Sequence, residues 1–175
     1  MRADELRALQ APLKDRYRRE PVSALVTLRA DASLDAAAVS CRVDTGRALV
    51  EAGLHPATGG TGQLACSGDL LLQALVACAG VTLRAVATAL EVPIRAGSVH
   101  AEGDLDFRGT LGVSREVPVG FREIRLRFEL DTDADASQLE RLLALTERYC
   151  VVLQTLRTPP VVRVAQAAAG SGPIA

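Results

Sequence analysis

The 175-residue sequence contains no tryptophan, one methionine and only 3% aromatic residues. Its hydrophobic fraction is nevertheless 49%, so a core has to be packed from leucine, valine and alanine. An excess of charge is also missing, because 20 basic residues are balanced by 21 acidic ones. This balance gives no general attraction to nucleic acid or to anionic lipid. The length fits one domain with a sizeable core.

The four cysteines form no CxxC pair, and no pair of histidines lies near them in the sequence. This spacing argues against a zinc site, and we expect neither a metal nor an organic cofactor. The first ten residues, MRADELRALQ, lack the apolar run of a signal peptide. We therefore expect a cytoplasmic protein whose cysteines are free thiols.

The stretch 67–90 predicts a long central helix. After Asp69 it contains one charged residue, Arg84, and apolar residues occupy every face. A helix that is apolar all round is expected to be buried all round. Its length also suggests a membrane span. We reject that alternative because Asp69, Gln73, Arg84 and many alanines keep its hydrophobicity modest.

The remaining pattern predicts an α+β fold with a mostly antiparallel sheet and helices packed on one face. Helices are expected at 3–19, where Pro12 could divide the helix, at 137–149 with a capping box at Ser137–Glu140, and onward to 156. Strands are expected at 24–29, 39–43, 47–52, 99–107, 121–130 and 161–164, with a turn at 31–36 and a loose tail from 165. We divide the chain into a helical extension, 1–20, and one domain, 21–175.

Three motifs have alternative interpretations. The first helix could dock on the sheet or on a partner, or lie on a membrane surface, although its apolar face is narrow for that. The glycines of the loop 55–63 could hold a phosphate, but no GK[ST] ending follows, so a flexible loop is the better interpretation. Neither His55 nor His100 can be combined with a serine and an aspartate by spacing, which disfavours hydrolase chemistry.

Cys78 lies in the middle of the central helix, and Cys150 lies about three turns after the start of the helical region predicted from 137. A buried cysteine is often only a small apolar residue. The segment Ser67–Cys78, SGDLLLQALVAC, however, resembles the S/P-x-E-L-L-x-A-L-x-x-C helix of the OsmC/Ohr family. Leu145–Val152, LTERYCVV, is similar to that family's second cysteine motif. The resemblance covers roughly residues 22–165.

This resemblance implies a sheet wrapped around two central helices in an intertwined homodimer. It also implies a thiol peroxidase that reduces organic hydroperoxides or hydrogen peroxide, with Cys78 as the peroxidatic thiol and Cys150 as the resolving thiol. In such chemistry a thiolate becomes a sulfenic acid and then a disulfide, which an external dithiol reduces. The partners expected are thus a second copy, a small hydroperoxide and a dithiol, with no nucleic acid and no membrane.

Peroxidase members of the family pair the thiol with an arginine and a glutamate. Asp69 stands at the glutamate position, where a helix-start carboxylate favoured by the helix dipole is the alternative. For the arginine the sequence leaves Arg42 and Arg47 open, with Arg29 as a weaker third. Cys66 precedes Cys78 by about three helical turns, ~16 Å or more, too far for direct pairing along the helix. Cys41 is expected to be a packing residue.

Two other functions stay open on the sequence. The first is a non-enzymatic module of the same fold that binds a small apolar ligand or senses redox state. The feature that separates it from a peroxidase is whether a guanidinium reaches Cys78. The second is a purely structural pair of thiols, which would require sulfur atoms far outside bonding range.

Overall fold

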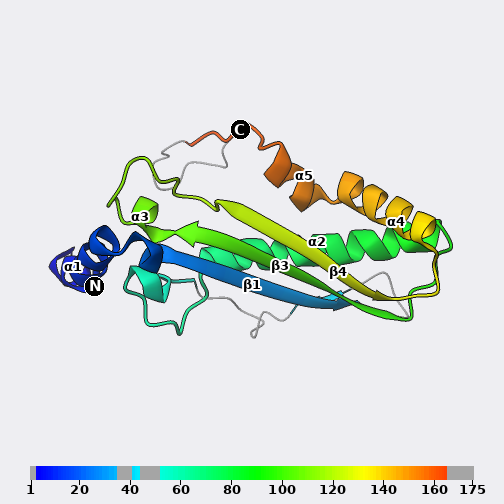
Figure 1. Cartoon of the computed structure of the whole chain (residues 1–175), viewed down its shortest axis with the longest axis horizontal. Coiled ribbons are helices and arrows are strands. Elements are labelled where there is room, and N and C mark those ends of the chain that lie inside the picture. Colours follow the sequence, from blue (N-terminus) through cyan, green and yellow to red (C-terminus); the bar gives the residue numbers. More distant parts are fainter. Residues whose placement is uncertain (1–2, 35–40, 44–51, 165–175) are drawn as a thin grey trace, which may run out of the picture.

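The computed structural model describes residues 3–34, 41–43 and 52–164. Its strands are β1 (Leu25–Leu34), β2 (Cys41–Val43), β3 (Ala96–Asp106) and β4 (Glu123–Asp131). Its α-helices are α1 (Ala3–Arg19), α2 (Ser67–Ala89), α3 (Phe107–Thr110), α4 (Ala136–Tyr149) and α5 (Val151–Arg157). Two short 3-10 helices, η1 (Pro21–Ala24) and η2 (Pro56–Thr58), follow α1 and precede α2 (Figure 1).

The described strands form one antiparallel sheet in the order β2-β1-β3-β4. Long registers hold its centre, from Leu25 opposite Asp106 in β1 and β3, and from Ala96 opposite Asp131 in β3 and β4. α2 packs lengthwise along the sheet, and α4 and α5 contact it as well (Figure 1). The predicted α+β class with an antiparallel sheet is confirmed.

The two faces of the sheet follow the alternation in the sequence. Val99, Ala101 and Leu105 are buried on the inner face of β3, and apolar residues of β4 pack against the same core. On the outer face Arg125 contacts Asp104 through an ion pair of 2.6 Å between Nη1 and Oδ2. Exposed ion pairs add little stability, so burial of the inner face provides most of the free energy that holds the sheet to the helices.

α2 provides the largest part of the inner layer. Its fully buried side chains include Leu72, Leu75 and Leu83, which join the two hydrophobic clusters of the fold. The prediction of burial on every face is wrong for the single chain, because Leu71 is 36% and Val81 is 41% exposed. By length and composition α2 is the one described helix that could cross a membrane. The core helix of a protein outside the membrane meets the same criteria of length and composition. In this structure β1, β3, α4 and α5 all pack against α2.

α1 is a single helix with Pro12 inside it, so the proline does not divide it. Tyr17 fixes this helix to the body of the protein, because its side chain is fully buried. Its hydroxyl donates to the carbonyl of Ala57 at 2.6 Å. Gln10 donates to the carbonyl of Thr58 at 3.3 Å. The extension thus covers the loop that leads into α2.

Several boundaries differ from those predicted. β1 continues through the predicted turn as far as Leu34, because residues 31–33 pair with β3 and residues 32–34 pair with β2. The predicted strand 161–164 has no regular structure, and its valines are exposed. β4 begins at Glu123 and not at Phe121, and the helix α3 was not predicted. The tail from 165 and all but Ala52 of the predicted strand 47–52 lie outside the described residues.

The start of α4 corrects the predicted capping box. Asp135, and not Ser137, is the N-cap: its carboxylate accepts from the N–H of Gln138 at 2.8 Å. The Gln138 side chain in turn accepts from the N–H of Asp135 at 3.0 Å. Ser137 lies inside the first turn. The sequence carries two overlapping cap patterns, and the reciprocal pair of hydrogen bonds selects the earlier one.

Replacing Asp135 with alanine should lower the free energy of unfolding by about 1 kcal/mol, because the N-terminal N–H groups of α4 lose their acceptor. Urea denaturation followed by circular dichroism would measure this change. The matched control is Ser137→Ala in the same turn, which should stay within about 0.5 kcal/mol of the parent. Equal losses in the two variants would contradict the assignment of the cap.

Candidate active site

Cys78 and Cys150 come together from different elements. Cys78 lies in the middle of α2 and is half-buried, whereas Cys150 stands between α4 and α5 and is fully buried. Both belong to the same hydrophobic cluster, and both are free thiols. The two thiols lie close enough for each to shift the pKa of the other. This contact removes the alternative that required two distant thiols.

Cys150 interrupts the C-terminal helical segment. Its backbone at φ −71° and ψ 105° ends α4, and α5 starts at the next residue. The N–H groups of Val151 and Val152 are therefore in the first turn of α5, where no helical carbonyl accepts from them. Both lie within hydrogen-bonding reach of the Cys78 sulfur.

These donors determine the ionisation of Cys78. Burial disfavours the thiolate, but the N–H of Val152, the thiol of Cys150 and the hydroxyl of Thr82 all donate to the sulfur. With the weaker contribution of the Val151 N–H, the pKa of Cys78 lies below its ordinary value. A thiolate is the nucleophilic form of cysteine. Cys78 is thus the more readily ionised of the two thiols.

Cys150 is shifted in the opposite direction. Burial, together with the neighbouring Cys78, raises the pKa of Cys150 to about 11, in spite of hydrogen bonding from the N–H groups of Leu153 and Val152. The two thiols are therefore shifted in opposite directions, and Cys78 ionises at a lower pH than Cys150. This asymmetry suits a nucleophile beside a second thiol that reacts only after the first has been oxidised.

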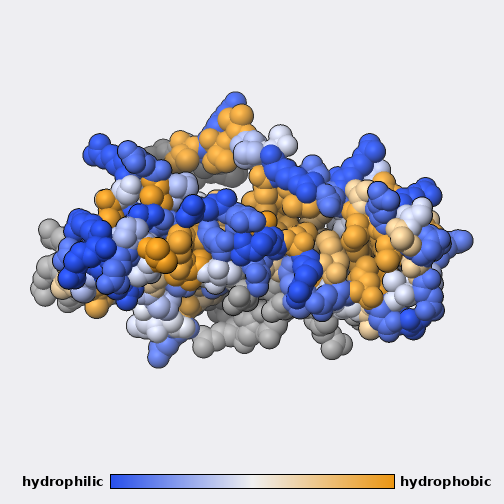
Figure 2. Space-filling model, in the orientation of Figure 1, coloured by the Kyte–Doolittle hydropathy of each residue, from blue (hydrophilic) through white to orange (hydrophobic). Residues whose placement is uncertain are grey.

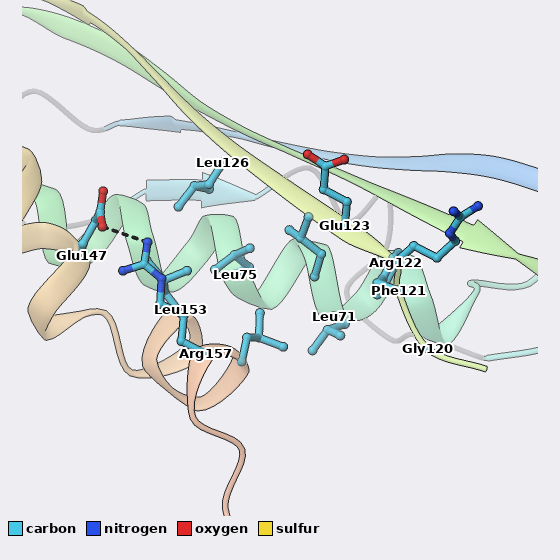
Figure 3. A pocket seen from close by; sticks show the side chains of 12 residues that line it. Leu71, Leu75, Gly120, Phe121, Arg122, Glu123, Leu126, Glu147, Leu153 and Arg157 are labelled. Atoms are coloured by element: carbon cyan, nitrogen blue, oxygen red, sulfur yellow. Dashed lines mark ion pairs between the residues drawn. The ribbon is translucent and has the colours of Figure 1, made fainter. Parts of the chain in front are cut away.

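A cavity of about 560 Å³ lies between α2, the start of β4 and α5, and Cys78 is not part of its lining. Leu71 and Leu75 line it from α2, and Cys78 follows three residues after Leu75 on the same helical face. Leu153, next to the Val152 donor, lines it from α5 (Figure 3). The charged side chains at its edge are Arg122, Glu123, Glu147 and Arg157. Arg157 and Glu147 form an ion pair of 2.9 Å.

Asp69 is not brought next to Cys78 within one chain. Nine residues of helix separate them by about 13 Å along the axis of α2. The titratable neighbour of Asp69 is His55. Burial raises the pKa of Asp69, and the positive charge of His55 only partly offsets this rise. Burial lowers the pKa of His55, an effect that Asp69 partly offsets. The predicted role of Asp69 at the Cys78 thiol stays a prediction.

The arginine predictions also stay open. Arg42 lies in β2, opposite Ser33 of β1, and Arg29 lies in β1, opposite Glu102 of β3. Arg47 lies outside the described residues. Cys41 begins β2. His100, within β3, bonds the Ser98 hydroxyl at 2.8 Å and takes no part in the thiol pair.

Cys66 precedes α2 and lines a second cavity of about 380 Å³, together with His55. It makes no disulfide. Within the described ranges no group of three or more histidine, cysteine, aspartate or glutamate side chains could hold a metal ion.

Sequence reasoning missed the groups that bond the Cys78 sulfur. Thr82 had a signal, because it is one helical turn after Cys78 and shares its face. The N–H groups of Val151 and Val152 had no such signal in the sequence. They are free to donate only because the helix is interrupted at Cys150.

A family model described as OsmC-like protein matches residues 60–165, which include both cysteines. The chain belongs to the OsmC-like family. The resemblance of the two cysteine motifs is thereby confirmed. No protein with a curated description matches the chain.

Solved structures agree with the OsmC-like fold. The structure of an OsmC-like hydroperoxide resistance protein from Jannaschia sp. CCS1 matches with a TM-score of 0.60 and 16% identity, covering 85% of this chain and 97% of the other. An OsmC-like protein from Mycoplasma pneumoniae matches with a TM-score of 0.53 and 18% identity, covering 69% and 79%. At these identities the likeness shows the fold alone. The family supports a peroxide-related role.

The pKa difference predicts the order in which the thiols react. Iodoacetamide should modify Cys78 first, with a rate that rises through a pH below the ordinary thiol pKa of about 8.5. Thr82→Val removes one donor to the thiolate, so half-maximal alkylation should move up by about one pH unit. Mass mapping at each pH would follow both sites.

The control is Thr88→Val, a threonine of the same helix whose hydroxyl donates to the carbonyl of Arg84. It should leave the pH profile of Cys78 unchanged. Faster alkylation of Cys150 than of Cys78 near pH 8 would contradict the assignment.

Proposed function

We propose that this OsmC-like protein is a thiol-dependent peroxidase that reduces organic hydroperoxides in defence against oxidative stress. The observation that supports this most strongly is the contact of two free thiols with opposite pKa shifts. The family also includes a structural relative described as a hydroperoxide resistance protein. A cavity with several apolar side chains in its lining includes Leu75, one helical turn before Cys78, and this favours organic hydroperoxides over hydrogen peroxide.

In the first step the Cys78 thiolate attacks the terminal oxygen of the hydroperoxide. The oxygen–oxygen bond breaks, the remaining alkoxide takes a proton from water and leaves as an alcohol, and Cys78 becomes a sulfenic acid. The backbone N–H groups of Val151 and Val152 hold the thiolate in place before the attack.

In the second step Cys150 attacks the sulfenic sulfur. The proton of its thiol and the hydroxyl of the sulfenic acid leave as water, and a Cys78–Cys150 disulfide forms. The two thiols are near enough to shift each other's pKa, which supports this pairing. An external dithiol then reduces the disulfide by thiol–disulfide exchange. This cycle fits a reducing cytoplasm, where we place the protein.

The assembly that we propose is a homodimer. α2 leaves Leu71 and Val81 partly uncovered, and the exposed large apolar residues include Val151, Val161 and Val162. Figure 2 shows hydrophobic residues at the surface near the C-terminal end of the described chain. A second copy that covers these residues could also supply the arginine or carboxylate that one chain does not bring to Cys78.

Fully reduced protein should consume cumene hydroperoxide in stopped-flow experiments and yield a Cys78–Cys150 disulfide on mass mapping. Cys78→Ser should abolish the reaction. Cys150→Ser should stop at the sulfenic acid, which dimedone would trap. Cys66→Ser, a thiol outside the pair, is the matched control and should react like the parent.

Consumption no faster than by a free thiol, with Cys78 unmodified, would exclude the peroxidase. Formation of the disulfide without repeated turnover in dithiothreitol would instead indicate the redox sensor.

A further inference from the structure

The break between α4 and α5 separates backbone groups that one continuous helix would pair. In such a helix the N–H groups of residues 151–153 would donate to the carbonyls of residues 147–149. The last regular bond of α4 runs from the N–H of Cys150 to the carbonyl of Thr146 at 2.9 Å. The first bond of α5 runs from the N–H of Gln154 to the carbonyl of Cys150, also at 2.9 Å. The three donors and three acceptors between these two bonds therefore need other partners.

The N–H groups at the break act on the two thiols. Those of Val151 and Val152 lower the pKa of Cys78. Those of Val152 and Leu153 act in the same direction on Cys150. The carbonyls on the other side of the break have to be satisfied separately, because an unpaired backbone acceptor away from water costs free energy.

One of these carbonyls has a side-chain donor. Glu147 is half-buried, whereas Arg148 and Tyr149 are exposed. The amide of Gln154 reaches the Glu147 carbonyl, to which its Nε2 donates at 2.6 Å. In an unbroken helix this carbonyl would accept from the N–H of Val151. The side chain of Gln154 thus replaces a backbone donor with a second amide N–H.

This hydrogen bond is specific to the broken form of the helix. In a continuous helix Gln154 would lie ~10.5 Å along the axis from Glu147, too far for its side chain to reach back to that carbonyl. Arg157 also contacts Glu147, through an ion pair of 2.9 Å (Figure 3). The side chains of that pair are 54% and 46% exposed, so water weakens it. The half-buried Gln154 therefore makes the stronger of the two links across the break.

We propose that Gln154 is a positioning residue for the thiol of Cys78. By occupying the Glu147 carbonyl, its amide prevents the Val151 N–H from returning to that carbonyl and keeps the helical segment broken at Cys150. The donors to the Cys78 sulfur and the position of the second thiol both depend on this break. The inference rests on the proposed function for its effect on peroxide turnover, whereas its effect on the ionisation of Cys78 can be measured without it.

The test is to remove the donor of this side chain and to follow the ionisation of Cys78. Gln154→Met keeps the length of the side chain but has no N–H to donate. Half-maximal alkylation of Cys78 by iodoacetamide should move up by about one pH unit, which is about a tenfold loss of thiolate below the midpoint. Gln154→Asn, whose amide is one methylene too short to make this bond, should shift the profile in the same direction. The matched control is Thr155→Ala at the next, exposed position of α5, which should leave the profile unchanged.

The pH dependence of turnover separates a positioning role from a purely structural one. In both Gln154 variants kcat/KM for cumene hydroperoxide should fall about tenfold at a pH below the alkylation midpoint of the parent, and it should recover well above the shifted midpoint. If no hydroperoxide reacts but the alkylation profile shifts, the proposed function fails and the role of Gln154 stands. An unchanged alkylation profile in both variants, or an equal loss of turnover at every pH, would overturn the inference.

Discussion

The packing of α2 against the junction of α4 and α5 is the contact on which the candidate site depends. If one helix ran from 136 to 157 without interruption, the N–H groups of Val151 and Val152 would be bonded to carbonyls one turn earlier. The extended backbone of Cys150 breaks that ladder and leaves both groups in the first turn of a new helix. The same break places the second thiol. One local change of backbone therefore supplies both the donors to Cys78 and its partner sulfur.

Burial alone would make both thiols inert, since desolvation raises the pKa of each. The difference between them comes from hydrogen bonds. Cys78 receives donors from α5 and from Thr82 on its own helix, and these outweigh the effect of burial. Cys150 is more deeply buried, and the developing charge of its neighbour opposes its ionisation. The arrangement separates two chemically identical groups into a nucleophile and a protonated partner.

Much of the fold follows from periodicity. The alternation from Ile124 to Leu130 and the apolar run of α2 were sufficient to predict a half-buried strand and a core helix. The cysteine motifs pointed to Cys78 and Cys150 as a pair. The donors to the thiolate could not be predicted, because they depend on how α5 packs on α2. The family resemblance gave Asp69 a role at the thiol, which stays a prediction; within one chain Asp69 lies near His55.

The scarcity of aromatic residues has a structural consequence. The chain has three phenylalanines, and each connects two parts of the structure. Phe128 contacts both hydrophobic clusters, Phe107 supports the imidazole of His55, and Phe121 lies between the two cavities. Leucine, valine and alanine fill the inner layer, but their small side chains leave space along α2. A ring at each of these places joins parts of a core that is otherwise packed from aliphatic side chains.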